Sequence, residues 1–543
     1  MISHTGTLAS YKSCQFLCHG SLDTKPASKN HRRLKMRQFS SYNAANLLTL
    51  FLATDAAAES TWPQQTFRST SIQAPYLNVT KNGKTELGNL FFSPSSSSME
   101  WSYPAIYSDD GQLVWQGPNA NTSAFQPQML DGEPVLAYWQ GANYLGYGFG
   151  AISILNASYQ EIHRITLPGT DQHFVTTADP ETFPSYIDIH ESQITSDGTI
   201  LVTAVNVTQC DLSPIGGPKD GWVQDGLFYE IDIKTNKVLF RWSTVEHLSE
   251  IPLTNTELPL LGSGTSKSDP YEYPHLNSVA KYGDSYLLSS RFMCSIFLLD
   301  KHGNVTWHLH GQKGASFTLL PGSSFCYQHD PRFINYSPNA TSLTLHLHNN
   351  ENANVFTSPT TITTGLTLTL DMQNHTATAV RKLWNPDAPL FAVSQGGFQP
   401  LPNGHVLLQH GAMPVIEEYD ENGALVMNAR FGFDESTQSY RGYRFREWVG
   451  KPTTRPEVVA CREGGRVVVY VSWNGATDVR GWKVRMGSEL GVVGDVREKN
   501  GFETRIVLDG VVGKDGEKVV VQAVGGVGDG VQSGVVKLGE GCS

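Results

Sequence analysis

The chain has 543 residues, of which 39% are hydrophobic and 10% aromatic, so it is long enough for two or more domains and is not compositionally disordered. Its net charge of -11 and pI of about 5.9 argue against nucleic acid as a partner, because nucleic-acid-binding proteins need a basic surface. An acidic surface is common among soluble secreted proteins.

The N-terminal region has the pattern of a targeting sequence. Residues 1–35 carry scattered basic residues and no periodicity, and we expect them to be a non-structural extension before a second start at Met36. Residues 36–58 then combine a basic end, the apolar run 44–53 (AANLLTLFLA) and three alanines typical of a cleavage site, which predicts a secretory signal peptide. The alternative is a buried N-terminal helix. The apolar run is far below the roughly 20 residues that cross a bilayer, and no later run reaches that length.

Glycosylation sequons and cysteines also favour export. Eight N-x-[ST] sequons lie between residues 78 and 374, and none follows. The last part of the chain is therefore compositionally distinct. The acceptor residues are Asn78, Asn121, Asn156, Asn206, Asn304, Asn335, Asn339 and Asn374. After the signal peptide five cysteines remain, so at least one thiol is unpaired or joins two chains. We expect Cys461 to pair with Cys542, because they bracket the C-terminal segment, and two of Cys210, Cys294 and Cys326 to pair.

Residues 59–454 repeat a unit of two strands joined by an Asp/Asn/Gly turn, often ending in tryptophan. The repeats lie at 107–115, 229–242, 299–307, 370–384 and 419–426, with companion hairpins such as 194–202 and 401–408. Two hairpins make one four-stranded sheet, and such sheets repeated around an axis are blades of a β-propeller. About six blades fit between residues 62 and 450. The prediction is an all-β propeller domain, and the alternative is a pair of large β-sandwiches.

Beyond Pro452 the sequence composition changes. Valine-rich runs in which apolar and polar residues alternate lie at 466–473, 481–485 and 518–523, separated by glycines. Short, regularly spaced strands with a core tryptophan are typical of a small β-sandwich. We therefore predict a fibronectin-III/Ig-like domain over residues 455–543, with a structural or adhesive role.

Three short polar clusters interrupt the predicted strands, and each contains one histidine. They are 188–191 (DIHE), 275–277 (HLN) and 328–330 (QHD). Each cluster precedes a run of residues with the pattern of one propeller blade. We therefore expect the clusters to converge on the axis of a ring. Imidazole has a large neutral fraction near pH 7 and is a suitable nucleophile or proton-transfer group.

Several segments taken in order carry a family resemblance. They are 188–191 with 195–199 (TSDGT), 216–222 (GGPKDGW), 275–279 (HLNSV), 289–291 (SSR), 328–332 (QHDPR), 402–404 (PNG) and 471–476 (VSWNGA). Together they resemble the fungal branch of the arylsulfotransferase (ASST) family over nearly the whole mature chain. The resemblance implies a six-bladed propeller that moves sulfuryl groups from aryl sulfates to phenols through a sulfohistidine, without a nucleotide donor, cofactor or metal.

The resemblance also implies roles for named residues. His329 would be the nucleophile, His190 and His275 proton-transfer or oxyanion-stabilising partners, Asn277 a hydrogen-bond donor and Arg291 a charge clamp. Sulfuryl transfer resembles phosphoryl transfer, which needs in-line positioning and cationic donors around a loose transition state. Ser394 is a loose candidate for the substrate-binding hydroxyl of bacterial relatives, and His410 stands where the fungal pattern more often has an aromatic residue.

Structural roles compete with these assignments. Asp188 or Glu191 would orient His190, Asn277 would cap a turn, and Arg291 would pair with Asp300. A zinc site is a further alternative, although the histidine spacing does not favour it. The pairs His346/His348 and His308/His310 alternate along predicted strands and read as polar strand faces.

Two other functions remain open at this point. One is a non-catalytic extracellular binding protein, which histidines paired directly with acids would favour. The other is a secondary-metabolite cyclase or hydrolase that uses the same histidines in acid-base chemistry.

Overall fold

The computed structural model describes residues 61–96, 102–144, 146–169, 174–177, 183–351, 361–434 and 436–542. The predicted extension and signal peptide lie outside these residues. The chain separates into units of residues 1–63 and 64–543, and all the described strands lie in the second. The fold is all-β, as the sequence predicts, with three short 3-10 helices at Ser213–Ile215, Val245–His247 and Leu253–Asn255. Within the described residues, helices are too short to cross a membrane.

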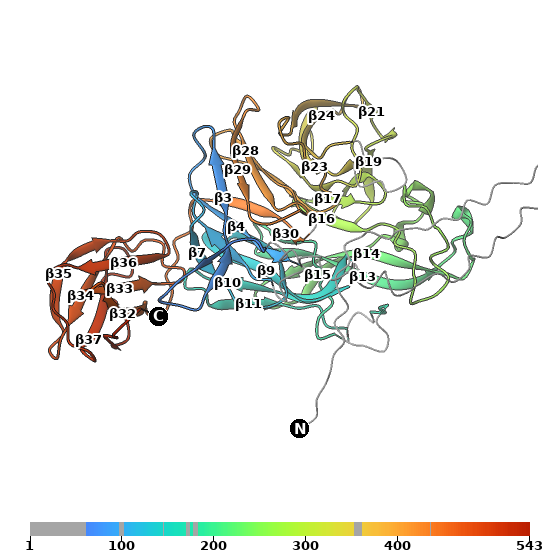
Figure 1. The fold of residues 1–543 in the computed structure, drawn as a ribbon. Coiled ribbons are helices and arrows are strands. Elements are labelled where there is room, and N and C mark those ends of the chain that lie inside the picture. Colours follow the sequence, from blue (N-terminus) through green and yellow to red (C-terminus); the bar gives the residue numbers. More distant parts are fainter. Residues whose placement is uncertain are drawn as a thin grey trace, which may run out of the picture. The chain divides into compact units, whose positions relative to one another are not determined.

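Six sheets of four or five strands, almost wholly antiparallel, lie between residues 78 and 445 (Figure 1). One sheet contains β8 (Thr122–Leu130), β9 (Glu133–Tyr144), β10 (Tyr147–Leu155) and β11 (Glu161–Ile165). The next contains β12 (Ser192–Ile194), β13 (Thr199–Cys210), β14 (Gly221–Asp232) and β15 (Val238–Ser243). A third contains β16 (Leu276–Tyr282), β17 (Ser285–Ser290), β18 (Ser295–Leu299), β19 (Val305–His310) and β20 (Gly314–Ala315).

The other three sheets follow in the chain. They are formed by β21 (Thr318–Leu319), β22 (His329–Phe333), β23 (Ser342–Asn349), β24 (Thr364–Asp371) and β25 (Thr376–Leu383); by β26 (Gly397–Pro400), β27 (Val406–Gln409), β28 (Val415–Tyr419), β29 (Leu425–Arg430) and β3 (Asn78–Lys81); and by β31 (Gly442–Phe445), β4 (Asn89–Phe92), β6 (Ala105–Tyr107) and β7 (Leu113–Gln116). Two short pairs are β1 (Gln64–Thr66) with β2 (Gln73–Pro75) and β5 (Ser95–Ser96) with β30 (Thr437–Gln438).

Early strands complete the late sheets. Strand β3 pairs with β29, and β4 pairs with β31; Figure 1 shows β3 in blue beside the orange strands β28 and β29. The sheets also contact one another in a closed order, through β8 with β12, β13 with β16, β16 with β22, β22 with β26, β26 with β31, and β31 with β8. Five of these six contacts join edge strands, and the contact between the second and third sheets is made by β13 instead of the edge strand β12.

The predicted turns explain the hairpins. Gly303 and Gly423 close the turns between β18 and β19 and between β28 and β29, with φ of 89° and 87°. Each glycine N–H donates to the carbonyl of the aspartate three residues earlier, Asp300 or Asp420, at 3.0 Å. Glycine suits these positions because it adopts positive φ without a steric penalty.

Buried tryptophans tie neighbouring elements together. The Trp242 indole N–H donates to the carbonyl of Gly303, in the next sheet, at 3.0 Å, and the Trp139 N–H donates to Ile187 at 2.8 Å. Both side chains are fully buried. Because a buried indole N–H needs an acceptor, these bonds fix the packing of the sheets as well as adding buried apolar area.

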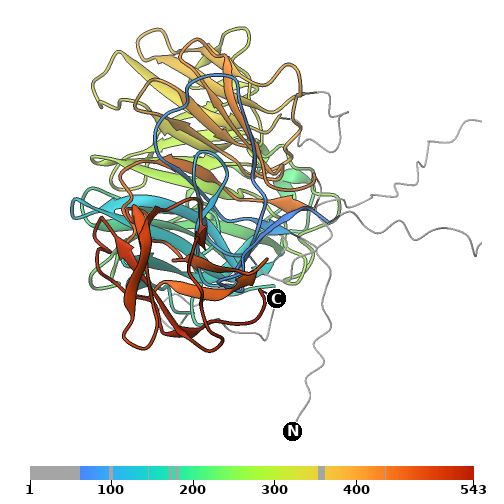
Figure 2. The ribbon, with the colours of Figure 1, turned by 60° about the vertical axis from the view of Figure 1, so that its left-hand side comes forward.

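The C-terminal residues form two more sheets, drawn in red in Figures 1 and 2. Their strands are β32 (Glu457–Glu463), β33 (Arg466–Ser472) and β36 (Glu503–Leu508) in one, and β34 (Gly481–Met486), β35 (Gly491–Glu498), β37 (Lys518–Val524) and β38 (Val536–Lys537) in the other. A shared core of valines contains Trp473 and Trp482. Cys461 pairs with Cys542, as expected, and of the other three cysteines Cys294 and Cys326 form the pair, which leaves Cys210 buried and unpaired.

Candidate active site

The three histidine clusters lie at equivalent places in three sheets. His190 lies two residues before β12, His275 lies immediately before β16, and His329 is the first residue of β22. Gln395 and Tyr440 lie two residues before β26 and β31. Because successive sheets contact each other through their edge strands and β13, these five side chains or backbones come together although 250 residues of chain separate the first from the last.

Backbone distortions mark the same places. The register shifts between Leu276 and Ser278 and between His329 and Arg332, and such bulges re-aim the neighbouring side chains. His275 and Gln395 adopt positive φ, at 44° and 66°. Left-handed backbone at a non-glycine residue costs about 1 to 3 kcal/mol and persists where the surroundings enforce it, which is common at functional sites.

His190 and His275 form a facing pair, each held by its own carboxylate. The Nδ1 atom of His190 contacts Asp188 and that of His275 contacts Glu272. The two rings meet edge to face with centroids 4.9 Å apart. Their Nε2 atoms make no hydrogen bond with the described residues, so both remain available to a ligand.

The carboxylates are ionised despite their surroundings. Burial raises the pKa of Asp188, but His190 and the Gly148 N–H outweigh this and hold the pKa below its ordinary value. Burial likewise opposes ionisation of Glu272, and the nearby charges of His275 and Arg291 lower its pKa overall. Glu272 in turn raises the pKa of His275, but burial, the largest effect, together with His190 and Arg291 keeps that pKa below its ordinary value.

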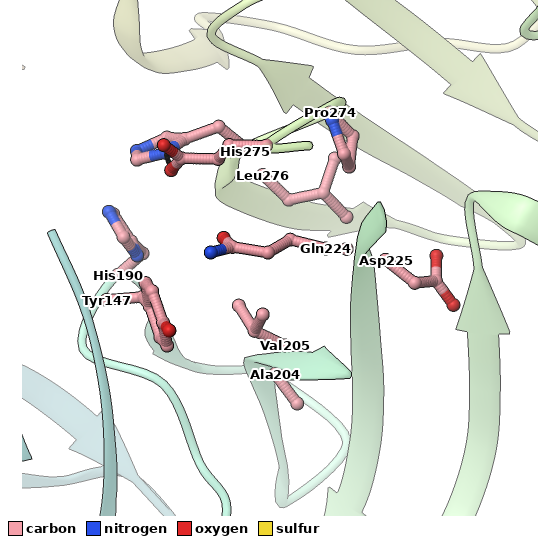
Figure 3. Close-up of a pocket in the computed structure, with 11 residues that line it drawn as sticks. Tyr147, His190, Ala204, Val205, Gln224, Asp225, Pro274, His275 and Leu276 are labelled. Atoms are coloured by element: carbon pink, nitrogen blue, oxygen red, sulfur yellow. Dashed lines mark hydrogen bonds and ion pairs between the residues drawn. The ribbon is translucent and has the colours of Figure 1, made fainter. Parts of the chain in front are cut away.

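A pocket opens beside this pair. It is lined by Tyr147, His190, Ala204, Val205, Gln224, Asp225, Gly226, Glu272, Pro274, His275 and Leu276. Figure 3 shows the Gln224 amide directed toward the two imidazoles, whereas Asp225 points the other way. Six of the eleven lining residues carry polar side chains, and the apolar surface comes from Ala204, Val205, Pro274 and Leu276.

His329 lies deeper and uses both ring nitrogens. Nδ1 lies 2.9 Å from Oδ1 of Asn350, and Nε2 accepts the backbone N–H of Gln395 at 3.1 Å. The residue is only 1% exposed. Burial lowers its pKa well below the ordinary value, and the charge of Arg291 lowers it further, so the ring is neutral at physiological pH.

Tyr440 joins the two parts of the site. Its ring lies edge-on to His190, with centroids 5.5 Å apart, and to His329, at 6.5 Å. The hydroxyl donates to the Asn277 carbonyl at 3.1 Å. Burial raises the pKa of Tyr440, so it is an un-ionised donor.

Arg291 brings positive charge to the same place. Its backbone N–H donates to the His275 carbonyl at 3.0 Å, and its guanidinium lies over the rings of Phe292 and Tyr327. The charge lowers the pKa of both His275 and His329, which places the guanidinium within electrostatic reach of both rings. It also donates to the Val393 carbonyl at 3.2 Å.

The structure decides between the alternative partners proposed for His190 and Arg291. Asp188 orients His190, whereas Glu191 accepts from Arg441 at 3.0 Å and from Arg332 at 2.6 Å. Asp300 accepts from Asn304 and from turn amides, so the expected pairing with Arg291 is wrong.

Asn277 and Ser394 support the site indirectly. The Asn277 amide donates to the Gln328 carbonyl at 2.7 Å, next to His329, so its role in the structure is to hold that segment rather than to cap a turn. Ser394 is half-buried, its carbonyl accepts from Ala412, and its hydroxyl makes no hydrogen bond with the described residues.

The remaining histidine pairs differ in whether they contact the three clusters. His308 stacks on Phe297, with centroids 4.5 Å apart, and His310 bonds Glu257 at 3.1 Å, both away from the three clusters. His346 stacks on Phe398 at 4.6 Å. His348 lies opposite His329 in the sheet and bonds the same Asn350. His348, which was predicted to lie on a polar strand face, therefore lies beside His329 in the site.

Sequence reasoning missed Glu272, Asn350, Gln395 and Tyr440. Glu272 had a detectable signal, because it precedes His275 by three residues as Asp188 precedes His190 by two. The other three act from other sheets, and nothing in their local sequence marks them. In the part of the chain that the structure describes, the three clustered histidines do not belong to a set of atoms close enough to share a metal ion.

Comparison with solved structures gives distant likenesses. The chain is similar to a protein of unknown function from Bacteroides caccae, at 14% identity and a TM-score of 0.33, covering 66% of this chain and 98% of that one. It is also similar to an α-L-arabinanase from Penicillium chrysogenum, at 11% identity and a TM-score of 0.31, covering 79% and 100%. A virginiamycin B lyase from Staphylococcus aureus matches at 10% identity and 0.25, covering 82% and 96%.

No curated protein matches the chain. The sequence pattern of the arylsulfotransferase (ASST) family, in contrast, matches residues 126–432, which is more than half of the 543 residues. That range contains His190, His275, Arg291 and His329, and ends before Tyr440. The chain therefore belongs to the arylsulfotransferase (ASST) family.

Proposed function

We propose that the chain is a secreted aryl sulfotransferase of the fungal branch of its family. It transfers a sulfuryl group from an aryl sulfate to a phenol, without a nucleotide donor, at the centre of a six-bladed propeller that a small β-sandwich domain follows. The observation that carries the proposal is the convergence of His190, His275 and His329 with Arg291 around one pocket region of an ASST chain.

The first half-reaction forms a sulfohistidine. The lone pair on Nε2 of His329 attacks the sulfur of the aryl sulfate, the N–S bond forms, and the bond between sulfur and the aryl oxygen breaks. The departing phenolate takes a proton from Nε2 of His190 or His275, whose Nδ1 is held by Asp188 or Glu272. Arg291 stabilises the negative oxygens of the group in transfer.

The second half-reaction returns the enzyme to its starting state. The now neutral His190 or His275 removes the proton of the acceptor phenol, the phenolate oxygen attacks sulfur, and the N–S bond breaks. The electron pair of that bond returns to Nε2 of His329. Donor and acceptor therefore exchange one sulfuryl group and one proton, and two easier steps replace one difficult step.

This mechanism requires a movement near His329. Its Nε2 lone pair is occupied by the Gln395 N–H at 3.1 Å, so the Gln395 backbone must shift before attack. The preceding residues are anchored by single hydrogen bonds, from Arg291 to Val393 and from Ala412 to Ser394. Ser394 is adjacent to the moving amide, and its unbonded hydroxyl is proposed to contact the substrate once the segment shifts.

The proposal of export is supported by the exposure of the sequons. Six of the eight acceptor asparagines are exposed, and Asn156 and Asn206 are half-buried and accept backbone N–H bonds. Enzymatic removal of N-glycans should lower the mass of protein secreted by a eukaryotic host. An unchanged mass would contradict glycosylation.

Activity is tested by incubating the purified protein with p-nitrophenyl sulfate and a phenol, and by measuring p-nitrophenol release together with formation of the sulfated acceptor. We expect transfer by the wild type and its loss in His329→Ala. A matched control is His405→Gln, which alters another histidine, 11% exposed and bonded to Glu418 at 2.8 Å, outside the site. Transfer activity that persists in His329→Ala would contradict the assignment of His329 as the nucleophile.

A non-catalytic binding protein is the second candidate, and one observation favours it. His190 and His275 do pair directly with acids. The pairing occupies only Nδ1 and leaves Nε2 available, as catalysis also requires. Binding of an aryl sulfate without turnover, measured by calorimetry, would support this candidate. Water-dependent breakdown of a cyclic metabolite without sulfuryl transfer would instead support the cyclase or hydrolase alternative.

A further inference from the structure

A chain of buried polar side chains leads away from His329 into the neighbouring sheet. Asn350 Oδ1 lies 2.9 Å from Nδ1 of His329 and 3.3 Å from Nδ1 of His348. Nε2 of His348 lies 3.3 Å from Nδ1 of His410, whose Nε2 lies 3.0 Å from Glu417. All five residues are at most 1% exposed. None of the proposed catalytic steps uses the last three.

The orientation of the Asn350 amide fixes the first protons of this chain. Its Nδ2 donates to the carbonyls of Ala392, at 2.9 Å, and Gln395, at 3.1 Å, so Oδ1 must be the atom that faces the two imidazoles. A carbonyl oxygen only accepts, and therefore Nδ1 carries the proton in both His329 and His348. The Gln395 N–H on Nε2 of His329 agrees with that tautomer.

The protons of His410 follow from its two neighbours. Burial and the adjacent His410 lower the pKa of His348 to about 3, so His348 is neutral and its Nε2 has no proton. Nδ1 of His410 must then donate to it. On the other side, burial raises the pKa of Glu417, but His410 and Tyr419 outweigh this and keep the carboxylate ionised, so Nε2 of His410 must donate as well.

We propose that His348, His410 and Glu417 are positioning residues for the sulfuryl-accepting histidine, and that His410 is held as a buried imidazolium paired with the Glu417 carboxylate. Together with the Ala392 and Gln395 carbonyls, the chain holds Asn350 so that His329 keeps its Nδ1–H tautomer and its Nε2 lone pair faces the Gln395 N–H, the position that the sulfuryl group takes once this amide has shifted. This role rests on the proposed function, whereas the protonation states do not. Titratable groups facing His410 are Glu417, which Tyr419 also bonds at 2.5 Å, and neutral His348.

The surroundings lock the chain in place. A side chain at Gly396 would approach His348 to 2.5 Å, so the loop packs closely against that ring. Oε1 of Glu417 accepts from Asn428 at 3.0 Å and from Asn385 at 3.2 Å. With its carboxylate saturated by donors, Glu417 keeps one position, and a fully satisfied buried network is rigid.

The proposal is tested on the full chain with ring-15N-labelled histidine. The wild type should show two ring N–H groups on His410 and one, on Nδ1, for His329. In Glu417→Gln, His410 should lose one ring proton near pH 7. In His348→Gln, Asn350 loses one of the groups that hold it, and kcat should fall on the order of 10- to 100-fold with little change in KM, as is typical when an orienting partner of a functional histidine is lost.

His405→Gln is the matched control, since it alters another histidine–glutamate pair, with a histidine side chain 11% exposed, that has no link to His329. A bare ring nitrogen on wild-type His410 at pH 7 would overturn the imidazolium. A kcat in His348→Gln within twofold of the control would overturn the positioning role. If the chain transfers no sulfuryl group, the proposed function fails, and the nitrogen signals still decide the protonation states. Should His348→Gln fail to fold, Glu417→Gln supplies the test.

Discussion

Substitution of Glu272 by glutamine probes the pairing that we propose prepares His275 for proton transfer. Glu272 contacts Nδ1 of His275, and their side chains are 27% and 8% exposed. A hydrogen bond to a charged group contributes about 1.5 to 3 kcal/mol, and partial exposure favours the lower value. Because about 1.4 kcal/mol is a factor of ten, the protonated fraction of His275 in Glu272→Gln should fall roughly tenfold at a given pH.

The sign follows from the forces on His275. Burial lowers its pKa, Glu272 raises it, and the charges of His190 and Arg291 lower it again. Loss of Glu272 leaves only the lowering effects, so the pH at which the proton-donating form disappears moves down. The assay is the pH profile of kcat/KM for p-nitrophenyl sulfate, together with an NMR titration of His275. A profile that stays in place or moves to higher pH would refute this account of the pair.

Three further predictions concern stability. Burial raises the pKa of Asp225 to about 6, so the folded state binds the extra proton and stability falls as pH rises from about 4 to about 6; Asp225→Asn should abolish that fall in a series of Tm measurements, and an unchanged series would contradict it. Replacing Cys294 and Cys326 by serine opens a 32-residue loop and should cost roughly 3 to 4 kcal/mol in chemical denaturation, with a cost near zero counting against the disulfide. Glu191→Gln leaves two buried arginines short of their counter-charge and should cost about 3 to 5 kcal/mol by the same assay; a loss below 1 kcal/mol would show that Asp330 suffices.

Local sequence patterns predicted the features that depend on local chemistry. The aspartate and glycine turns that close β18–β19 and β28–β29 are visible because positive φ at glycine has a sequence signature. The histidine clusters were found because polar residues interrupt apolar strands, and the structure brings His190, His275 and His329 toward Tyr440.

Features that depend on pairing between distant strands could not be read from the sequence. Strand β3 joins a sheet made more than 300 residues later, β31 joins the early sheet of β4, β6 and β7, and no local pattern encodes either register. The Gln395 N–H on His329 comes from a backbone group, which leaves no trace in residue type. Asn350 reaches His329 because β22 and β23 pair around a bulge, and a shift of one residue would turn its neighbours to the other face.

The central claim is that His329 accepts the sulfuryl group, and trapping that intermediate tests it most directly. The protein is mixed with p-nitrophenyl sulfate in the absence of a phenol, quenched, digested and analysed by mass spectrometry. The account predicts the added mass of one sulfuryl group on the peptide that contains His329, its loss when a phenol is added before the quench, and its absence in His329→Ala. The added mass on the peptide of His190 or His275, or on none of the three while transfer proceeds, would contradict it.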